Sequence, residues 1–282
     1  MKITVTENLA DPCPSGKKSQ GGFTLLELLV ALVITGAVVS AAYGIYVTQH
    51  ENWIIQEQVS DMQQNARTAM HELENRIRMA GYGLPSGVHP ISAANSNPDT
   101  AAVFFKNESG CEATVEHNMT DPTAELRCDG HDLSCFGDTT WAYIYDPAAD
   151  TGEYFFISQV QVASYRIQHG TDPLSRAYPS GSRVMYVDMY KFYIDATDSS
   201  HPNLMVAREG NQSYVYAEDI EDLQFRYGLA NGLFVDVPPS ASVVREVLIG
   251  LTARTARKDL QFQADYRRRS LASDVKVRNL GL

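Results

Sequence analysis

The sequence predicts an α+β protein in which one long N-terminal helix packs on an antiparallel, β-rich head. Apolar residues recur at helical spacing between residues 23 and 80, a stretch without proline, and beyond residue 85 they alternate with the period of two that is typical of strands. The length of 282 residues, the 44% apolar content and the mean hydropathy of -0.24 suffice for a buried core and exclude a disordered chain or a multi-span channel.

The first half of the predicted helix is long and apolar enough to cross a membrane. Residues 23–47 have the sequence FTLLELLVALVITGAVVSAAYGIYV, in which 19 of 25 residues are apolar and Glu27 is the single charge. At about 1.5 Å per residue the segment covers roughly 37 Å, more than the ~30 Å of a hydrocarbon layer. Because Lys17 and Lys18 precede it, we expect the N-terminus in the cytoplasm and the rest of the chain outside.

The residues just before the apolar run differ from a secretory signal, whose cleavage site follows its apolar core. Here Gly21 and Gly22 come first, beside the lysines, and Phe23-Thr-Leu-Leu-Glu27 follows at once. This order resembles the class III leader of type IV pilins and pseudopilins. The resemblance implies that a prepilin peptidase cuts between Gly22 and Phe23 on the cytoplasmic side and methylates Phe23. Residues 1–22 would then be a cleaved leader, and residues 23–80 the pilin-type helix.

Glu27 has an unfavourable position if it lies within lipid. A carboxylate in a bilayer costs on the order of 3 kcal/mol or more, and intramembrane acids usually face a protein partner. Cleavage would release an amine at Phe23, one helical turn from Glu27 or beside the same residue of a neighbouring subunit. We therefore predict that the two charges neutralise each other during assembly. The alternative is an acid near the helix end whose side chain reaches the interface.

The second half of the helix should be amphipathic and lie against the head. Its predicted buried stripe comprises Ile55, Val59, Met62, Ala66, Ala69 or Met70, Leu73, Ile77 and Ala80. The segment Gly81-Tyr-Gly-Leu-Pro85 ends the helix, which gives one helix of about 58 residues and roughly 87 Å. Gly36 and Gly44 are predicted points of helix flexibility, or else permit close helix packing in the membrane.

Residues 81–282 are expected to form a periplasmic or extracellular β-rich head. The predicted strands are 101–106, 141–145, 154–165, 183–194, 204–208, 223–227, 243–253, 261–266 and 271–277. In residues 243–253, one face holds the apolar residues Val243, Val247, Ile249, Leu251 and Ala253, as a sheet with one wet face requires. Residues 85–100 are predicted to be a surface connection.

Three local patterns narrow the family. They are Met62-Gln-Gln-Asn-Ala-Arg67 running to Ile77-Arg-Met-Ala-Gly-Tyr-Gly83, Ile220-Glu-Asp-Leu-Gln224 with Tyr227-Gly228, and an Arg-rich segment closing on Val277-Arg278-Asn279. Together they resemble the PilW family of type IV minor pilins. The resemblance implies a low-abundance subunit that primes pilus assembly in a tip complex. Its implied partners are other minor pilins, the major pilin, prepilin peptidase and the inner-membrane assembly platform.

Two other functions stay open at the level of the sequence. A J-type minor pseudopilin of type II secretion has the same leader and helix. A tip adhesin or ligand-binding domain could use residues 86–216. Neither alternative needs a cofactor, and no cofactor is expected.

The cysteines indicate one disulfide in an oxidising compartment. Cys13 would leave with the leader, so Cys111, Cys128 and Cys135 stay in the mature chain, with three possible pairings and one thiol left over. A zinc site that uses these cysteines with His131 has a spacing that matches no common finger, so no metal site is predicted. The aspartates near these cysteines, like Asp195 and Asp198, lack a full calcium loop.

No enzyme activity is predicted. Cys111 with His117, or Ser134 with His131, would make a nucleophile and base pair without any oxyanion or orienting group. The formal charge of -11 argues against a general nucleic-acid binder. The charge is uneven: residues 89–153 hold twelve acids and two bases, whereas residues 245–282 hold nine bases and four acids. Such regions could align neighbouring heads, pair within one head, or both be solvated.

Overall fold

A computed structural model describes residues 22–85, 88–170, 172–208, 212–238, 244–259, 262, 264–277 and 279. The chain divides into two compact units, Met1–Ile54 and Ile55–Leu282. Helix α1 (Leu25–Met79) belongs to both units, and the strands all belong to the second. A long apolar N-terminal helix followed by antiparallel sheets confirms the predicted α+β class.

Helix α1 buries the predicted stripe from Met62 onward, whereas Ile55 and Val59, which the prediction also included, are only partly buried. The buried side chains of the helix are Met62, Ala66, Ala69, Met70, Leu73 and Ile77. The helix ends where the sequence predicts, since Gly81 has a φ of 77°, a left-handed conformation that glycine adopts without steric cost. Arg76 and Arg78 in the last turn complement the negative end of the helix dipole.

The larger sheet is antiparallel and has the order β1-β2-β8-β5-β6-β7-β4, with β3 and β9 also on β8 and β10 on β9. Its first strands are β1 (Ile91–Ala94), β2 (Thr100–Lys106), β3 (Glu112–Thr114), β4 (Leu126–Arg127) and β5 (Thr140–Asp146). They continue with β6 (Thr151–Gln161), the 3-10 turn η1 (Val162–Ser164), β7 (Arg166–His169), β8 (Arg183–Asp195), β9 (Asn203–Ala207) and β10 (Ser213–Ala217).

The smaller sheet has the order β12-β11-β13-β14 and is also antiparallel. Its strands are β11 (Ile220–Leu229), β12 (Phe234–Val235), β13 (Val244–Arg254) and β14 (Arg268–Lys276). On β13 the buried residues Val247, Ile249, Leu251 and Ala253 share one face, which confirms the predicted alternation. Arg254 departs from the pattern because it is buried beside Glu221 and under the Tyr266 ring.

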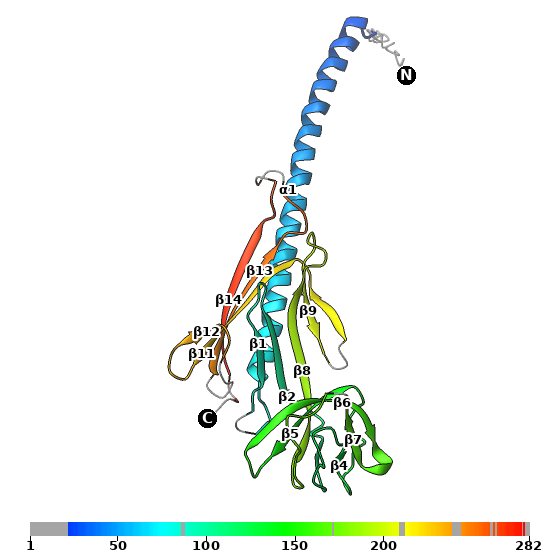
Figure 1. The fold of residues 1–282 in the computed structure, drawn as a ribbon. Helices are drawn as coiled ribbons and strands as arrows, with labels where there is room; N and C mark the ends of the chain where they lie inside the picture. The colour runs from blue at the N-terminus through cyan, green and yellow to red at the C-terminus, as the bar shows by residue number, and fades with distance from the viewer. Residues whose placement is uncertain are drawn as a thin grey trace, which may run out of the picture. The chain divides into compact units, whose positions relative to one another are not determined.

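The main core lies between the second half of α1 and the two sheets. Leu73 and Ile77 of the helix pack in one cluster with residues of both sheets, such as Phe105 of β2 and Phe225 of β11. In Figure 1 the cyan part of α1 runs alongside β13 and β14 of one sheet and β1, β2 and β8 of the other. Both sheets therefore pack against the same helix in this core.

A second core belongs to residues 107–182, which we call the distal lobe. Leu133, Ile144 and Ile157 are fully buried in it, in one cluster with Val184 of β8. Strand β8 serves both cores: Val187–Phe192 pairs with β2, and Arg183–Val187 pairs with β5. Long β8 thus joins the distal lobe to the part of the head that packs on α1.

Several sequence expectations for the head are wrong in detail. The predicted strand 261–266 is a turn in its described residues, held by an isolated bridge between Asp259 and Asp265. The stretch 85–100 is more than a surface connection, because Ile91–Ala94 forms β1 and Val88 and Ile91 are buried. The end of the predicted strand 154–165 is the turn η1. The sequence interpretation also omitted β3, β4, β7, β10 and β12, which are short.

Candidate processing and assembly site

The start of α1 is fixed by a reciprocal pair of hydrogen bonds between Thr24 and Glu27. The backbone N–H of Glu27 donates to Thr24 Oγ1 at 3.2 Å, and the backbone N–H of Thr24 donates to Glu27 Oε2 at 3.0 Å. The Thr24 hydroxyl also donates to Glu27 Oε2, at 3.2 Å. With Thr24 as N-cap and Glu27 three residues later, this is a capping box, which satisfies two N–H groups that the first helical turn leaves without partners.

The predicted cleavage site lies directly before this cap. Gly22 and Phe23 precede the first helical residue, and the Phe23 side chain is 90% exposed. A side chain at Gly22 would meet no atom within 4 Å. The bond between them is therefore accessible and non-helical, as proteolytic sites usually are. The rest of the predicted leader, residues 1–21 with Cys13, lies outside the described residues.

The first half of α1 is apolar and exposed. Its most apolar window has a mean hydropathy of 2.3 and none of it is buried, which makes α1 the single candidate membrane span in the described chain. Leu25, Leu32 and Ile34 are all more than half exposed to the surroundings. Such a surface is unfavourable in water and favourable in lipid or against other apolar helices.

One side of this exposed half is formed by small residues. Gly36 and Gly44 have open space where a Cβ would stand. A hollow of about 410 Å³ is lined by Ser40, Ala41, Gly44, Ile45, Thr48 and Gln49. Thr48 Oγ1 donates to the Gly44 carbonyl at 3.1 Å. The backbone is α-helical through both glycines, so their predicted flexibility stays a prediction, whereas the small-residue surface that permits close helix packing is present.

These residues at the start of the helix match a known motif. Residues 17–43 match the prokaryotic N-terminal methylation motif. Together with the apolar helix that follows it, this match supports a type IV pilin-like protein. The motif includes Gly22, Phe23 and Glu27, and prepilin peptidase processing and pilus assembly partners follow from it in general terms. The pilin-like chain has no match among curated proteins.

The cysteines of the pilin-like chain pair in one of the three ways that the sequence leaves open. Cys111 and Cys135 form a disulfide with a Cα–Cα distance of 5.8 Å, and Cys128 is a buried free thiol. Burial, with smaller effects of Asp129 and Glu116, raises the pKa of the Cys128 thiol to about 12. The thiolate form, which binds metals and attacks electrophiles, is therefore suppressed.

The disulfide blocks two of the chemical alternatives considered for the distal lobe, the Cys111–His117 pair and the zinc site. Cys111 is oxidised, so it cannot act as a nucleophile with His117, and the disulfide takes up two of the thiols a zinc site would need. His117 instead pairs with Asp129 at 2.7 Å, and His131 pairs with Glu116 at 3.0 Å. Within the described residues, no group of three or more His, Cys, Asp or Glu side chains is placed to hold a metal ion.

The two oppositely charged regions both form local ion pairs. In the acidic region Glu112 binds Lys106 and Arg183. In the basic region Arg268 binds Glu221 at 2.6 Å and Asp265 at 2.8 Å. These pairs neutralise part of each region's charge within one head, without a need for contact between the regions.

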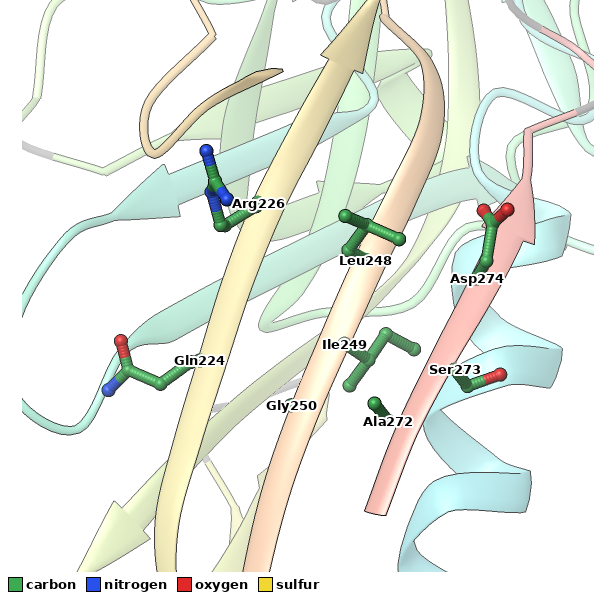
Figure 2. Close-up of a pocket in the computed structure, with 8 residues that line it drawn as sticks. All are labelled: Gln224, Arg226, Leu248, Ile249, Gly250, Ala272, Ser273 and Asp274. Atoms are coloured by element: carbon green, nitrogen blue, oxygen red, sulfur yellow. The ribbon is translucent and has the colours of Figure 1, made fainter. Parts of the chain in front are cut away.

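The outer face of the smaller sheet has a shallow hollow of about 420 Å³. Figure 2 shows its lining on β11, β13 and β14, namely Gln224, Arg226, Leu248, Ile249, Gly250, Ala272, Ser273 and Asp274. Gln224, Gly250 and Ala272 are paired neighbours in one row across the sheet. Because Gly250 and Ala272 are small, the row is sunken. The sequence interpretation missed this hollow, since the pairing of distant strands creates it.

Sequence reasoning also missed the role of Thr24, although a signal for it exists. The spacing Thr24-x-x-Glu27 before an apolar run is the sequence signature of a capping box. The interpretation of Glu27 considered its charge alone. The structure adds that Glu27 is already hydrogen-bonded while the leader is attached.

Proposed function

We propose that the chain is a minor pilin that helps to prime a type IV pilus. The observation that carries this proposal is the position of the Gly22–Phe23 bond. It is exposed and non-helical, it lies one residue before a capped and exposed apolar helix, and it falls within a segment that matches the methylation motif. A peptidase at the cytoplasmic membrane surface can reach such a bond without unwinding the helix.

The precursor is a single-pass protein of the inner membrane in this proposal, with residues 23–47 in lipid. Its domains are the leader 1–22, the helix 23–80 and a head from residue 81 onward in the periplasm. Cleavage removes the leader, and methylation modifies the amine of Phe23. The mature protein then lies in the periplasm or in the pilus, which extends to the cell surface.

Cleavage also changes the partners available to Glu27. Before it, the carboxylate accepts hydrogen bonds from Thr24. Afterwards a cationic amine at Phe23 lies within the same turn, or reaches Glu27 from an adjacent subunit. A contact between two opposite charges is stronger than one in which the carboxylate alone is charged, and in lipid it removes two unpaired charges at once. We propose that this exchange couples processing to lateral assembly.

The specific role as a minor pilin is supported by the resemblance to the PilW family and by the small-residue side of α1. The hollow over Ser40, Gly44 and Thr48 allows another helix to approach closely. Other minor pilins and the major pilin are the proposed neighbours, with the inner-membrane platform as the assembly machine.

The first experiment tests processing by the intact mass of the membrane-extracted protein. The wild-type chain should begin at a methylated Phe23, and Gly22→Val should retain residues 1–22. A wild-type chain that keeps Met1, or a Gly22→Val chain of mature mass, contradicts the proposal. A Gly21→Val chain, changed one residue further from the bond, is the matched control and should be processed.

The second experiment separates the pilus from the secretion system. Deletion of the gene should abolish twitching and surface pili while exported enzymes reach the medium normally. Loss of exported enzymes with retained twitching assigns the chain to a type II secretion pseudopilus. Normal twitching and export, with lost surface binding, assigns it to an adhesin.

A further inference from the structure

Three ring side chains stack along the exposed half of α1, at the point where its apolar run ends. The ring centroids of Tyr46 and His50 are 6.0 Å apart with planes at 3°, and those of His50 and Trp53 are 6.2 Å apart with planes at 14°. The spacings of four and three residues place them on one side of the helix. Tyr46 is 65% exposed and Trp53 58%. We call Tyr46, His50 and Trp53 the ring ladder.

The ring ladder is at a defined axial distance from Glu27. Tyr46 lies 19 residues after Glu27 and Trp53 lies 26 residues after it, which correspond to about 29 Å and 39 Å along the axis. The hydrocarbon core of a bilayer is ~30 Å thick, or ~40–45 Å with both headgroup layers. If the carboxylate of Glu27 lies at the inner interface, the ladder therefore covers the outer one. Helical side chains lean toward the N-terminus, which brings the Trp53 ring further into this layer.

The chemistry of the ladder suits that layer. Tyrosine, histidine and tryptophan each present an apolar body with a polar tip, and tyrosine and tryptophan concentrate where lipid tails meet headgroups. The neighbouring positions become polar at this level, since Gln49, Glu51 and Asn52 follow Val47, the last residue of the apolar run 23–47. In water three exposed stacked rings are unfavourable, and in the hydrocarbon their polar groups lack partners.

The ladder also faces away from the small-residue hollow. Gly44 and Trp53 are nine residues apart, which at about 100° per residue places them on opposite sides of the helix. A helix that contacts lipid through the ladder therefore leaves the hollow at Ser40, Gly44 and Thr48 available to another helix.

We propose that the ring ladder binds the headgroup layer of the outer leaflet and sets the depth of the precursor in the membrane. This inference rests on the proposed membrane span. The ligand is the phospholipid interface, with the rings among the upper acyl chains and the hydroxyl, imidazole and indole groups bonded to ester and phosphate oxygens. Since α1 is a continuous helix, fixing Trp53 in the outer headgroup layer fixes Glu27 near the inner edge of the lipid and the Gly22–Phe23 bond at the inner surface.

The test measures depth by tryptophan fluorescence. The chain has two tryptophans, Trp53 and Trp141, so Trp141→Phe leaves Trp53 as the only reporter. The full precursor is reconstituted at high dilution into phosphatidylcholine vesicles with bromine either near the headgroup or near the chain ends. We expect quenching of Trp53 that is about twice as strong for the shallow bromines. Equal or stronger quenching by the deep bromines overturns the proposal.

A second reporter keeps failure of the ladder distinct from failure of the membrane span. Val38→Trp with Trp53→Phe and Trp141→Phe places the reporter near the middle of the apolar run, where deep bromines should quench most strongly. If neither reporter is quenched by any bromine, the span itself is refuted. If only Val38→Trp is quenched, Trp53 lies in water and the ladder proposal alone falls, which leaves a protein neighbour as the partner of the rings.

The depth-setting role has its own variant. The variant replaces all three rings of the ladder by serine, in a reporter chain that carries Val38→Trp and Trp141→Phe; its ladder changes are Tyr46→Ser, His50→Ser and Trp53→Ser. Without the rings the depth of the helix in the membrane should vary, so the reporter's preference for deep bromines should fall. The control variant changes the same level of the helix on other sides, through Gln49→Ser and Asn52→Ser. It is made in the reporter chain with Val38→Trp, Trp53→Phe and Trp141→Phe, and the preference for deep bromines should stay intact. An unchanged preference in the serine ladder variant would show that the rings do not set the depth.

Discussion

The Glu27 carboxylate accepts a hydrogen bond from the backbone N–H of Thr24 at 3.0 Å, while the Thr24 hydroxyl oxygen accepts one from the Glu27 N–H at 3.2 Å. The first turn of the helix is therefore ordered before the leader is removed. In the proposed mature chain, this arrangement would hold the Glu27 carboxylate within one turn of the new amine at Phe23.

Thr24→Ala should loosen the helix start, because loss of an N-cap side chain costs about 1 kcal/mol. We expect hydrogen exchange at the Glu27 amide to become about fivefold faster in the detergent-solubilised precursor. Thr24→Ser keeps the hydroxyl and should exchange as the wild-type chain does. Equal exchange in the alanine and wild-type chains would show that the capping box does not hold in solution.

Glu27→Gln should separate cleavage from assembly. The amide keeps the shape of the side chain but cannot neutralise a cationic amine, so the protein should be cut after Gly22 and yet be depleted from sheared pili. Intact mass and immunoblots of the sheared fraction measure the two steps. Glu27→Asp retains the charge and should be depleted less. Wild-type amounts of the glutamine variant in pili would refute the charge pairing.

Leu73→Ala should destabilise the head, because the side chain of Leu73 on α1 is fully buried against the two sheets. Removing a buried leucine side chain costs about 3 kcal/mol. A lower urea midpoint of head unfolding, followed by near-UV circular dichroism in detergent, is the expected result. Leu29→Ala changes an exposed leucine in the same helix and should leave the midpoint in place. Equal midpoints for both variants would contradict the packing.

The disulfide between Cys111 and Cys135 should stabilise the distal lobe. It closes a loop with a sequence separation of 24 residues, for which chain-entropy arguments give about 3 kcal/mol. Replacing both cysteines by serine should expose the lobe to limited proteolysis at lower urea. Cys128→Ala leaves the disulfide intact and is the control. Identical cleavage patterns in the two variants would mean that the bridge contributes little.

The Cys128 thiol should resist alkylation in the folded chain. Burial first, and then Asp129 and Glu116, raise its pKa from 9.0 to about 12. With Cys13→Ser removing the leader thiol, iodoacetamide at pH 8 should label the chain only after unfolding. An unfolded thiol ionises near pH 9 and the folded one near pH 12, so the folded state retains a proton that the unfolded state loses.

The free energy of unfolding should therefore fall as the pH rises through this interval. Cys128→Ala should remove that part of the pH dependence, and urea midpoints at successive pH values measure it. Rapid labelling of Cys128 at pH 8 under native conditions would refute its burial.

The sequence predicted those features that depend on local patterns. The 3.6-residue spacing of Met62, Ala66, Leu73 and Ile77 predicts the buried side of α1, and the alternation in β13 predicts its core face. The candidate cleavage site is likewise local, since Gly22 and Phe23 adjoin the apolar run.

Features that depend on distant pairing were not predictable. Strand β3 has three residues, too few to show a period, and it exists because Ala113 pairs with Val184. The choice of Cys135 over Cys128 as the partner of Cys111 depends on how the distal lobe folds. Residues 261–266 were wrongly predicted to be a strand because they have the composition of one. Their described part turns instead at Ala264, whose φ is 54°.

The distal lobe leaves and re-enters the rest of the head at adjacent points. Lys106 at the end of β2 pairs with Val187 of β8, and the Asn107 N–H donates to the Tyr186 carbonyl at 3.0 Å. Residues 107–182 are thus an insertion between two paired strands. Their other contacts with the rest of the head include those of the Trp141 and Tyr154 rings with Phe104 of β2, and none of their described residues belongs to the core cluster that contains α1. Changes in the length or sequence of this insertion leave the contacts of α1 undisturbed, so the sequences of related subunits should diverge most within it.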